Sequence, residues 1–407
     1  MRARDGMDEP FDLILRGGEV IDPVARRTFA ADVGIRNGRV AAVQEALAGR
    51  ATREIDARGL IAGPGWVDTH THVFKLFKPS GLDADGVGVE QGVVAVIDAG
   101  SFGAENAPAF HEYVVKPAKT MVFGLLHISR HGNMHEPGES EIVSWLNIDD
   151  ALKTIAANRD WIRGMKVRAS ASAVGTLGIM PVVLAKKAAS EAAVPLMAHV
   201  GNAPPTLDEV CRLFEAGDVI THCFHGKAGG VFSGSTDRRK GALPAALDAA
   251  ERGVVFDVGH GSGSFSHVVA REWLRCRLPV GHISTDLHGG NRNGPVFSLA
   301  LTMSKLLGLA ESVENEAMDL FGVVAAVSLN PAKTFGLDHL IGPVAPGARA
   351  NLTVFRLVDR EVRVQDSYRA EWSIKRLIVP RYAIVRGVVH EATHGAHGMH
   401  LAPEEIG

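Results

Sequence analysis

The sequence has few cysteines, little net charge and no long apolar segment, and each of these absences argues against a class of protein. The three cysteines, Cys211, Cys223 and Cys276, are widely spaced and form no C-x-x-C pair, so neither a disulfide framework nor a cysteine zinc site is expected. The sequence contains no run of about 18 apolar residues, so no membrane-spanning helix is expected. The first ten residues lack the apolar core of a secretion signal. We therefore expect a cytoplasmic protein.

Charge is nearly balanced along the 407 residues of the chain. Lys and Arg number 43 and Asp and Glu number 46, which gives a formal net charge of -3. Proteins that collect nucleic acid or anionic membranes usually carry a basic excess, so neither partner is expected. With 46% hydrophobic residues the chain can bury a large core. The expected partner is a small-molecule substrate, and the expected assembly is a homo-oligomer.

Apolar runs of strand length alternate with helical segments in the middle of the chain, from about residue 66 to 335. This alternation predicts an α/β fold in which parallel strands are buried by helices on their outer side. The number of candidates matches a (β/α)8 barrel of the TIM type, which typically has about 250 residues. A doubly wound open sheet is the alternative. The eight candidates are residues 66–68, 92–97, 120–126, 161–167, 195–200, 219–223, 254–258 and 280–284.

The two ends of the chain have a different pattern, in which short β-rich runs are separated by turns. Examples are Gly17–Gly18 and Asn37–Gly38 near the start, and the same style resumes after Pro346. We therefore predict that residues 1–64 and 340–407 together form a small β-sandwich domain, and that residues 65–339 form the barrel. Both chain ends would then build one domain.

The strongest local signal is Asp68-Thr69-His70-Thr71-His72, which directly follows an apolar run. Alternate residues of a strand face the same side, so His70 and His72 can present two imidazoles to one metal ion. By itself an H-x-H motif is weak evidence, because most histidines are surface or hydrogen-bonded residues. Its place at the end of the first predicted barrel strand strengthens it, since active sites of such barrels lie at the carboxyl ends of the strands.

Further possible ligands end later strand candidates, namely His199, His222 and Asp286. The carboxyl ends of parallel barrel strands converge on one face, where ligands from separate strands can meet. Lys166 ends another candidate. A lysine is usually a solvated surface charge and a poor ligand, but CO₂ can convert a buried neutral amine into a carbamate whose two oxygens bridge two cations.

Three residues are candidate substrate contacts. His260 lies between two glycines that permit a close approach of the backbone, and the alternative is a loop histidine that fixes its own turn. Arg130 and Arg168 can each clamp a substrate carboxylate through a bidentate guanidinium, although arginines more often serve structural ion pairs. The loops that select a substrate are expected at 127–141 and 227–240.

These motifs resemble the amidohydrolase superfamily, near the dihydroorotases and dihydropyrimidinases. The resemblance rests on the hairpin-rich start, the run GLIAGPGWVDTHTH at 59–72 and the ending from Pro343 to Val354, and it covers nearly the whole chain. Three shorter motifs resemble a bacterial branch of metal-dependent amidohydrolases known as deacetylases. They are GMKVRAS at 164–170, AHVG at 198–201 and STDLHG at 284–289.

The resemblance implies two divalent metal ions, expected to be zinc, held at the barrel face. Two such cations depress the pKa of a bridging water, so that hydroxide forms at neutral pH. Asp286 would also move the proton from this water to the leaving group. As ligands the resemblance implies His70, His72 and Asp286 for the more buried ion, His199 and His222 for the second ion, and a carboxylated Lys166 as the bridge.

The implied reaction is hydrolysis of an amide or ester bond of a small molecule by this metal-activated hydroxide. Deacetylation of an N-acyl or O-acyl carboxylic acid is one form of it. A cyclic-amide hydrolase, of the dihydroorotase, hydantoinase or lactamase kind, would use the same metal pair and differ in its loops. A mononuclear deaminase would not need Lys166. A protein of the same fold that only binds partners and has no activity would have lost some metal ligands. All six ligand positions implied by the resemblance are filled here.

Overall fold

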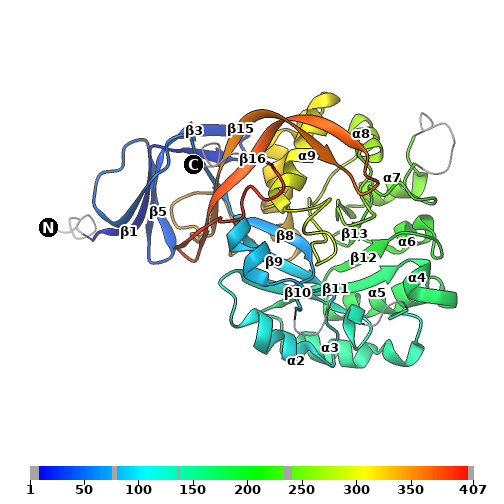
Figure 1. The fold of residues 1–407 in the computed structure, drawn as a ribbon. Coiled ribbons are helices and arrows are strands. Elements are labelled where there is room, and N and C mark those ends of the chain that lie inside the picture. The colour runs from blue at the N-terminus through cyan, green and yellow to red at the C-terminus, as the bar shows by residue number, and fades with distance from the viewer. Residues whose placement is uncertain (1–8, 76–79, 135–137, 233–240, 402–407) are drawn as a thin grey trace.

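The computed structural model describes residues 9–75, 80–134, 138–232 and 241–401. Two parts can be followed in Figure 1: small sheets at the left, which contain the start of the chain, and a parallel sheet covered by helices at the right. Residues 135–137 and 233–240 of the predicted substrate loops lie outside the described residues. The same holds for residues 1–8 and 402–407 of the predicted end domain.

Seven strands form one parallel sheet in the order in which they occur in the chain. They coincide with the first seven strand candidates, with ends that differ by at most three residues. Because helices cover the outer face and side chains fill the inner one, these strands are almost wholly buried, as continuous apolar runs predict. The strands are β8 (Trp66–Thr71), β9 (Val93–Ala99), β10 (Met121–His127), β11 (Ile162–Ala169), β12 (Leu196–Val200), β13 (Val219–Thr221) and β14 (Val255–Asp257).

The eighth candidate, residues 280–284, forms no regular strand, and this part of the prediction is wrong. The segment instead makes two isolated parallel bridges, one from His282 to Asp257 of β14 and one from Leu287 to Thr71 of β8. A reason lies at Asp286, whose φ of +53° is left-handed and interrupts regular pairing. Residues 282–287 thus connect the two edges of the seven-stranded sheet.

Helices follow the strands and cover the outer side of the parallel sheet (Figure 1). Their ends have local causes: the side chain of Asn147 caps α3, a capping box of Thr206 and Glu209 begins α6, and Pro244 is the first residue of α7. These helices fill the intervals between the strands, where helical segments were predicted. The helices are α1 (Ala84–Val87), α2 (Ala107–Phe110), α3 (Ile148–Ala157), α4 (Ala171–Val174), α5 (Met180–Ala192), α6 (Leu207–Leu213), α7 (Pro244–Glu251), α8 (His267–Arg275), α9 (Leu299–Ser312), α10 (Leu320–Ala326) and α11 (Leu329–Thr334).

Two further sheets contain the ends of the chain. The first has the order β5-β4-β1-β6 and the second the order β17-β16-β15-β7-β2-β3. In the second sheet β7 pairs with β2 on one side and with β15 on the other, so strands from both parts of the chain share one sheet. The strands are β1 (Phe11–Arg16), β2 (Glu19–Asp22), β3 (Arg27–Ala30), β4 (Asp32–Arg36), β5 (Arg39–Gln44), β6 (Ala51–Asp56), β7 (Ile61–Pro64), β15 (Leu352–Gln365), β16 (Glu371–Val385) and β17 (Val388–Glu391).

The hairpin of β15 and β16 is much longer than the other strand pairs and leaves the end sheets. In Figure 1 it runs across α9 and its turn lies beside α8. Ile374 and Leu377 of β16 are buried in the same hydrophobic cluster as Leu306 of α9. Gly308 of α9 permits this contact, because a Cβ there would lie 2.6 Å from Cγ2 of Ile374. The hairpin is therefore packed into the core of the larger part.

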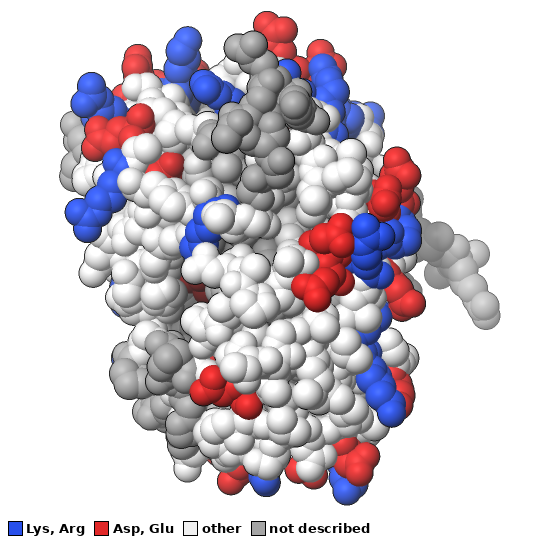
Figure 2. Space-filling view, turned by 90° about the vertical axis from the view of Figure 1, so that its right-hand side faces the viewer, with Lys and Arg blue, Asp and Glu red and all other residues white. Residues whose placement is uncertain are grey.

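Charged side chains are mixed in sign on the face shown in Figure 2. Acidic and basic groups lie mainly around the margin of that face, and its centre is mostly uncharged. No extended patch of one sign is visible among the residues coloured there, which agrees with the near balance of charge in the composition. No single helix in the described ranges is long and apolar enough to cross a membrane, although α4 with the turn after it and α5, bent by 97°, would pass together.

Candidate metal centre and active site

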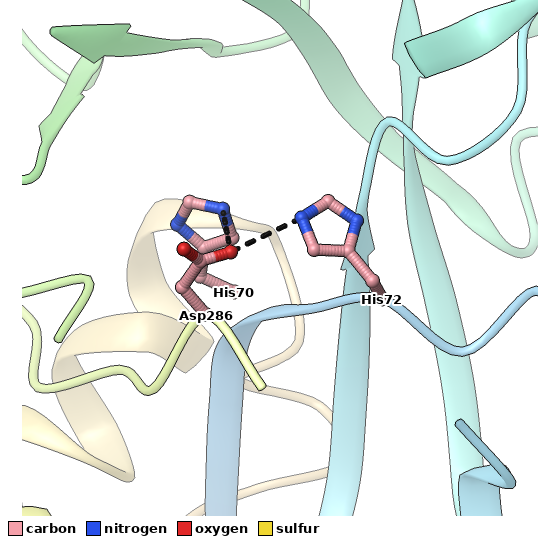
Figure 3. A group of neighbouring side chains, drawn as sticks. All are labelled: His70, His72 and Asp286. Atoms are coloured by element: carbon pink, nitrogen blue, oxygen red, sulfur yellow. Dashed lines mark ion pairs between the residues drawn. The ribbon is translucent and has the colours of Figure 1, made fainter. Parts of the chain in front are cut away.

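Two histidines at the end of β8 and one carboxylate from the segment 282–287 converge on one point. Oδ1 of Asp286 lies 3.4 Å from Nε2 of His70 and 3.1 Å from Nε2 of His72. Figure 3 shows the carboxylate next to both rings. One ligand atom from each of the three residues lies within 4.8 Å of the other two, a spacing that suits a single metal ion.

Hydroxyl groups hold the far nitrogen of each imidazole. Nδ1 of His70 lies 3.0 Å from Oγ1 of Thr221, and Nδ1 of His72 lies 2.8 Å from Oγ of Ser101. The Thr221 hydroxyl donates its one proton to Oδ2 of Asp257, at 2.5 Å, so it can only accept from His70. The proton of His70 therefore sits on Nδ1. This leaves the lone pair of Nε2 directed at Asp286 and available to an ion.

His222 and His199 extend this group on the side of β12 and β13. Nδ1 of His222 donates to the carbonyl of Gly259 at 2.6 Å, while its buried Nε2 has no hydrogen-bond partner in the described part of the chain. This Nε2 lies 3.9 Å from Oδ2 of Asp286, and the ring of His199 packs edge-on at 4.4 Å between centroids. An unpartnered buried nitrogen is costly, and a metal ion would satisfy it.

Lys166 is buried in the middle of these ligands, with 2% exposure. Its Nζ lies 3.2 Å from Nε2 of His70 and 3.4 Å from the sulfur of Met197, and it forms no ion pair with a carboxylate of the described residues. Burial lowers the pKa of the Lys166 ammonium to about 7, so the neutral amine is accessible at neutral pH. A buried charged lysine without an acidic partner would be destabilising, and this environment suits an amine that is uncharged or modified.

Burial favours the neutral form of three histidines of the group, His70, His199 and His222. Burial lowers the pKa of His70 and of His199 well below its ordinary value, and that of His222 to about 4. Protonated imidazole cannot bind a metal, whereas neutral imidazole can. The site is thus prepared for cations without first releasing protons from these rings.

A buried aspartate fixes the segment that carries Asp286. Asp68 accepts hydrogen bonds from the backbone N–H of Thr285 at 3.1 Å and from its hydroxyl at 2.5 Å. The N–H of Asp286 donates to the carbonyl of His70 at 2.6 Å. These bonds hold Asp286 in its left-handed backbone conformation. The sequence analysis named Asp68 only as part of the motif. Its position between an apolar run and the H-x-H pair is the sequence feature that indicates this role.

A cavity of about 320 Å³ opens on the ligand group. Arg168, one of the predicted substrate contacts, lines it, and Nη1 of this arginine lies 3.2 Å and 3.3 Å from the two carboxylate oxygens of the buried Glu139. Glu139 thus orients the guanidinium from one side. Asn133 lies in the predicted substrate loop 127–141 and His288 in the motif STDLHG, whereas nothing in its local sequence marks Ser80. The lining consists of His70, His72, Ser80, Asn133, Lys166, Arg168, His199, Asp286, His288 and Gly290.

Lys227, the first residue of the predicted substrate loop 227–240, adds a second cation on the same side. A Cβ on Gly201 would lie 3.5 Å from Nε2 of His199 and 3.9 Å from Nζ of Lys227, so these two nitrogens lie on the same side of Gly201. Burial lowers the pKa of Lys227, and the positive charge of Arg168 lowers it further. Lys227 therefore lies near His199 and within reach of the charge of Arg168.

The other two predicted substrate contacts do not line this cavity. Arg130 borders a separate hollow, where its Nε lies 3.2 Å from Oε2 of Glu105. The buried ring of His260 stacks on Phe265, and its Nε2 lies 2.9 Å from Nζ of Lys305. These placements agree with the alternatives given for the two residues, a structural ion pair for Arg130 and a loop histidine for His260.

Thr221→Val should weaken metal binding by about ten- to a hundredfold, because the variant keeps the shape of the side chain but loses the acceptor that fixes the His70 tautomer. Competition with a chelator measures the change. Thr69→Val is a matched control, since the Thr69 hydroxyl on the same strand as His70 has no hydrogen-bond partner among the described residues. Equal metal affinity in the two variants would disprove a role for Thr221.

The chain is similar to several known proteins. The model of the amidohydrolase family matches residues 280–389. A deacetylase of Agrobacterium fabrum is 39% identical over 352 residues, which are 86% of this chain and 84% of that protein, and a deacetylase of Enterococcus faecalis is 36% identical over 386 residues, 94% and 99%. The solved structure of an adenine deaminase has a TM-score of 0.85 at 35% identity and covers 94% of this chain and 100% of its own. That of a dihydroorotase has a TM-score of 0.83 at 36% identity, with 93% and 97% covered.

Fold, ligand group and relatives agree on the class, which is that of metal-dependent hydrolases acting on carbon–nitrogen bonds. The chain belongs to the amidohydrolase family and fits its deacetylase-like branch. The resemblance inferred from the motifs at 59–72, 164–170, 198–201 and 284–289 is thereby confirmed. The names of the relatives refer to different substrates. The substrate of this chain is therefore inferred from the residues that line the cavity.

Proposed function

We propose that this protein is a binuclear metallohydrolase that removes an acyl group from an N-acyl or O-acyl carboxylic acid. The observation that carries the proposal is the buried, unpartnered Nε2 of His222, next to a triangle of ligands that suffices for one ion. The first ion would be held by His70, His72 and Asp286. The second would be held by His199 and His222, and zinc is proposed because imidazole and carboxylate ligands suit it.

Lys166 is proposed as the bridge between the two ions, in the form of its carbamate. Its Nζ adjoins Nε2 of His70, and its burial supplies the neutral amine that reacts with CO₂. Gly100 supports this position, because a Cβ there would lie 2.7 Å from Cγ of Lys166 and would push the stem away. An unmodified amine offers one donor atom, whereas a carbamate offers two oxygens.

Two divalent cations at this place would lower the pKa of a water molecule and polarise the acyl carbonyl. Asp286 is proposed to accept the proton of that water and to deliver it to the leaving nitrogen or oxygen. The hydrogen bonds from Thr285 to Asp68, and from the N–H of Asp286 to the carbonyl of His70, keep the Asp286 carboxylate at the reaction centre. Burial lowers the pKa of His70, His199 and His222, so these three rings are neutral and do not supply competing protons.

Arg168 and Lys227 are proposed to bind the carboxylate of the substrate. Arg168 lines the cavity and is oriented by Glu139, and Lys227 lies on the same side of Gly201 as His199, which also lines it. The names of the deacetylase relatives support an acetyl group as the acyl part. A dihydroorotase-like ring opening is the second candidate, favoured by the similar dihydroorotase structure.

Activity on a panel of substrates tests the proposal. We expect hydrolysis of N-acetyl or O-acetyl carboxylic acids to be much faster than hydrolysis of the matching amides that lack the carboxylate. Dihydroorotate and a hydantoin are included as cyclic amides. Turnover of the cyclic compounds alone would overturn the deacylase proposal and favour the second candidate.

Arg168→Met should raise KM for an N-acetyl amino acid by about ten- to a hundredfold, because a charge-assisted hydrogen bond to the carboxylate is lost while the stem is kept. The same variant should leave KM for an acyl substrate without a carboxylate nearly unchanged. Steady-state kinetics on both substrates measure the difference. An equal loss on both would show that Arg168 acts on the fold or the metals and not on the carboxylate.

We also propose that the parallel sheet closes into a (β/α)8 barrel through residues 282–287, which bridge both of its edges. Residues 65–339 would form this barrel, and residues 1–64 and 340–407 a β-sandwich, as the shared sheet of β2, β7 and β15 supports. A cytoplasmic location, a homo-oligomeric assembly and a small-molecule substrate complete the proposal. Light scattering of the purified protein measures the assembly.

A further inference from the structure

The loop of residues 259–261, which follows β14, touches two of the proposed metal ligands through its backbone. The carbonyl of Gly259 accepts the hydrogen bond of His222. Gly261 has φ of +56°, and a Cβ on it would lie 2.7 Å from Oδ2 of Asp286. A Cβ on Gly259 would likewise collide with the Thr221 hydroxyl. Any displacement of this loop therefore moves the supports of His222 and Asp286 together.

Ser367, in the turn of the β15–β16 hairpin, forms several hydrogen bonds with this loop and with Phe265. Oγ of Ser367 donates to the carbonyl of Gly261 at 2.8 Å and to that of His260 at 3.2 Å, and it accepts from the N–H of Phe265 at 3.2 Å. The N–H of Ser367 donates to the carbonyl of Phe265 at 3.0 Å. The hydroxyl thus shares its one proton between two carbonyls and accepts with one lone pair, all on the segment that follows β14.

The turn that carries Ser367 is itself fixed. Asp366 accepts from the N–H and from Nδ1 of His267, at 3.0 Å and 2.8 Å, which ties the turn to the first residue of α8. The Tyr368 hydroxyl donates to the carbonyl of Gly263 at 3.1 Å and accepts from the N–H of Gly226 at 2.8 Å. Figure 1 shows the hairpin reaching α8 from the end sheets. Ser367 is therefore presented from a rigid support.

His260 anchors the loop from the inside. Its Nδ1 donates to the carbonyl of Gly261 at 3.1 Å, and its Nε2 accepts from Nζ of the buried Lys305. Lys305 also donates to the carbonyl of Pro295 at 2.7 Å. The loop is thus held by α9 within the core, by Ser284 and Thr285, which accept from the N–H groups of residues 259 to 261, and by Ser367 from the hairpin. Of these supports only Ser367 belongs to the end-sheet hairpin.

We infer that Ser367 is a positioning residue of the active site, which acts through the loop 259–261 on His222 and Asp286. The turn of the β15–β16 hairpin thereby completes the metal centre, although it lies far from the ligands in the sequence. Ser367 touches neither ligand directly, so its effect is on their placement. The inference rests on the proposed function, because it assigns His222 and Asp286 to metal binding.

The test uses the full-length, zinc-loaded protein with Ser367→Ala, Ser367→Thr and Ser373→Ala. Ser373 is an exposed serine of β16 in the same hairpin and serves as the matched control. Ser367→Ala should lower kcat by about fivefold to tenfold with KM changed less than about twofold, and it should weaken binding of the more loosely held zinc by a similar factor. Hydrogen exchange at residues 259–265 should become faster. Ser367→Thr keeps a hydroxyl and should recover most of the loss.

Two results would overturn the inference. One is Ser367→Ala protein with the kcat, zinc affinity and hydrogen exchange of Ser373→Ala. The other is a variant of lower thermal stability whose zinc affinity and kcat are unchanged, since Ser367 would then be merely structural. Failure of the proposed function is seen separately, because unaltered protein would then bind no zinc pair before any variant is made.

Discussion

Lys166→Ala is expected to release most of the bound metal and to lower hydrolysis by roughly three orders of magnitude or more. The side chain is buried between the ligands of both proposed ions, and its neighbours His70 and Met197 cannot supply a bridging oxygen. Removing it therefore lowers the affinity of both ions at once. Metal content after dialysis and turnover of an N-acetyl amino acid measure the two effects.

Chemical rescue separates a lost ligand from a lost fold. Acetate or propionate at high concentration can occupy the space left by the carbamate and should restore part of the activity of Lys166→Ala. Lys187→Ala removes an exposed lysine of α5 and should change neither metal content nor turnover. If Lys166→Ala held two metals and turned over at the normal rate, Lys166 would be a structural lysine and the bridge would have to be formed by water alone.

Asp286→Asn is expected to keep metal but to lower kcat by about two to four orders of magnitude, the range that general acid–base groups contribute. The amide oxygen can still coordinate an ion next to His70 and His72, whereas the amide cannot accept the proton of the attacking water. The variant therefore separates binding from proton transfer. Metal content and kcat, determined on the same preparation, provide the readout.

A second signature of this variant lies in its pH dependence. In the unaltered protein the rate should fall at low pH as the group that accepts the proton becomes protonated, and this limb should disappear in Asp286→Asn. Asp248→Asn, on the exposed face of α7, is the control. A kcat close to normal in Asp286→Asn would assign proton transfer to another residue.

Most of the parallel sheet and of the metal group could be predicted from the sequence, for a physical reason. Strands buried on both faces need continuous apolar runs, and such runs are visible at β8 to β14. Because parallel strands present their carboxyl ends on one side, a polar residue that follows an apolar run marks the site. His70, His199, His222 and Lys166 were all found in this way.

Features that depend on contacts between distant segments could not be predicted. A strand was expected at 280–284, just before Asp286, but the conformation next to Asp286 is fixed by hydrogen bonds to Asp68, more than two hundred residues earlier. The arginines 130 and 168 have the same residue type, and only the fold decides that Glu105 pairs with one and Glu139 with the other. The contact of Ser367 with the loop 259–261 likewise leaves no trace in the local sequence.

Metal stoichiometry combined with activity tests the binuclear centre most directly. The purified protein is analysed for zinc and other divalent ions as prepared, after prolonged chelation and after reconstitution, and hydrolysis of an N-acetyl carboxylic acid is measured on each sample. We expect close to two ions per chain in the active samples, loss of hydrolysis with loss of metal, and recovery on its return. Full hydrolysis by protein that is verified to be free of metal would contradict the proposed function.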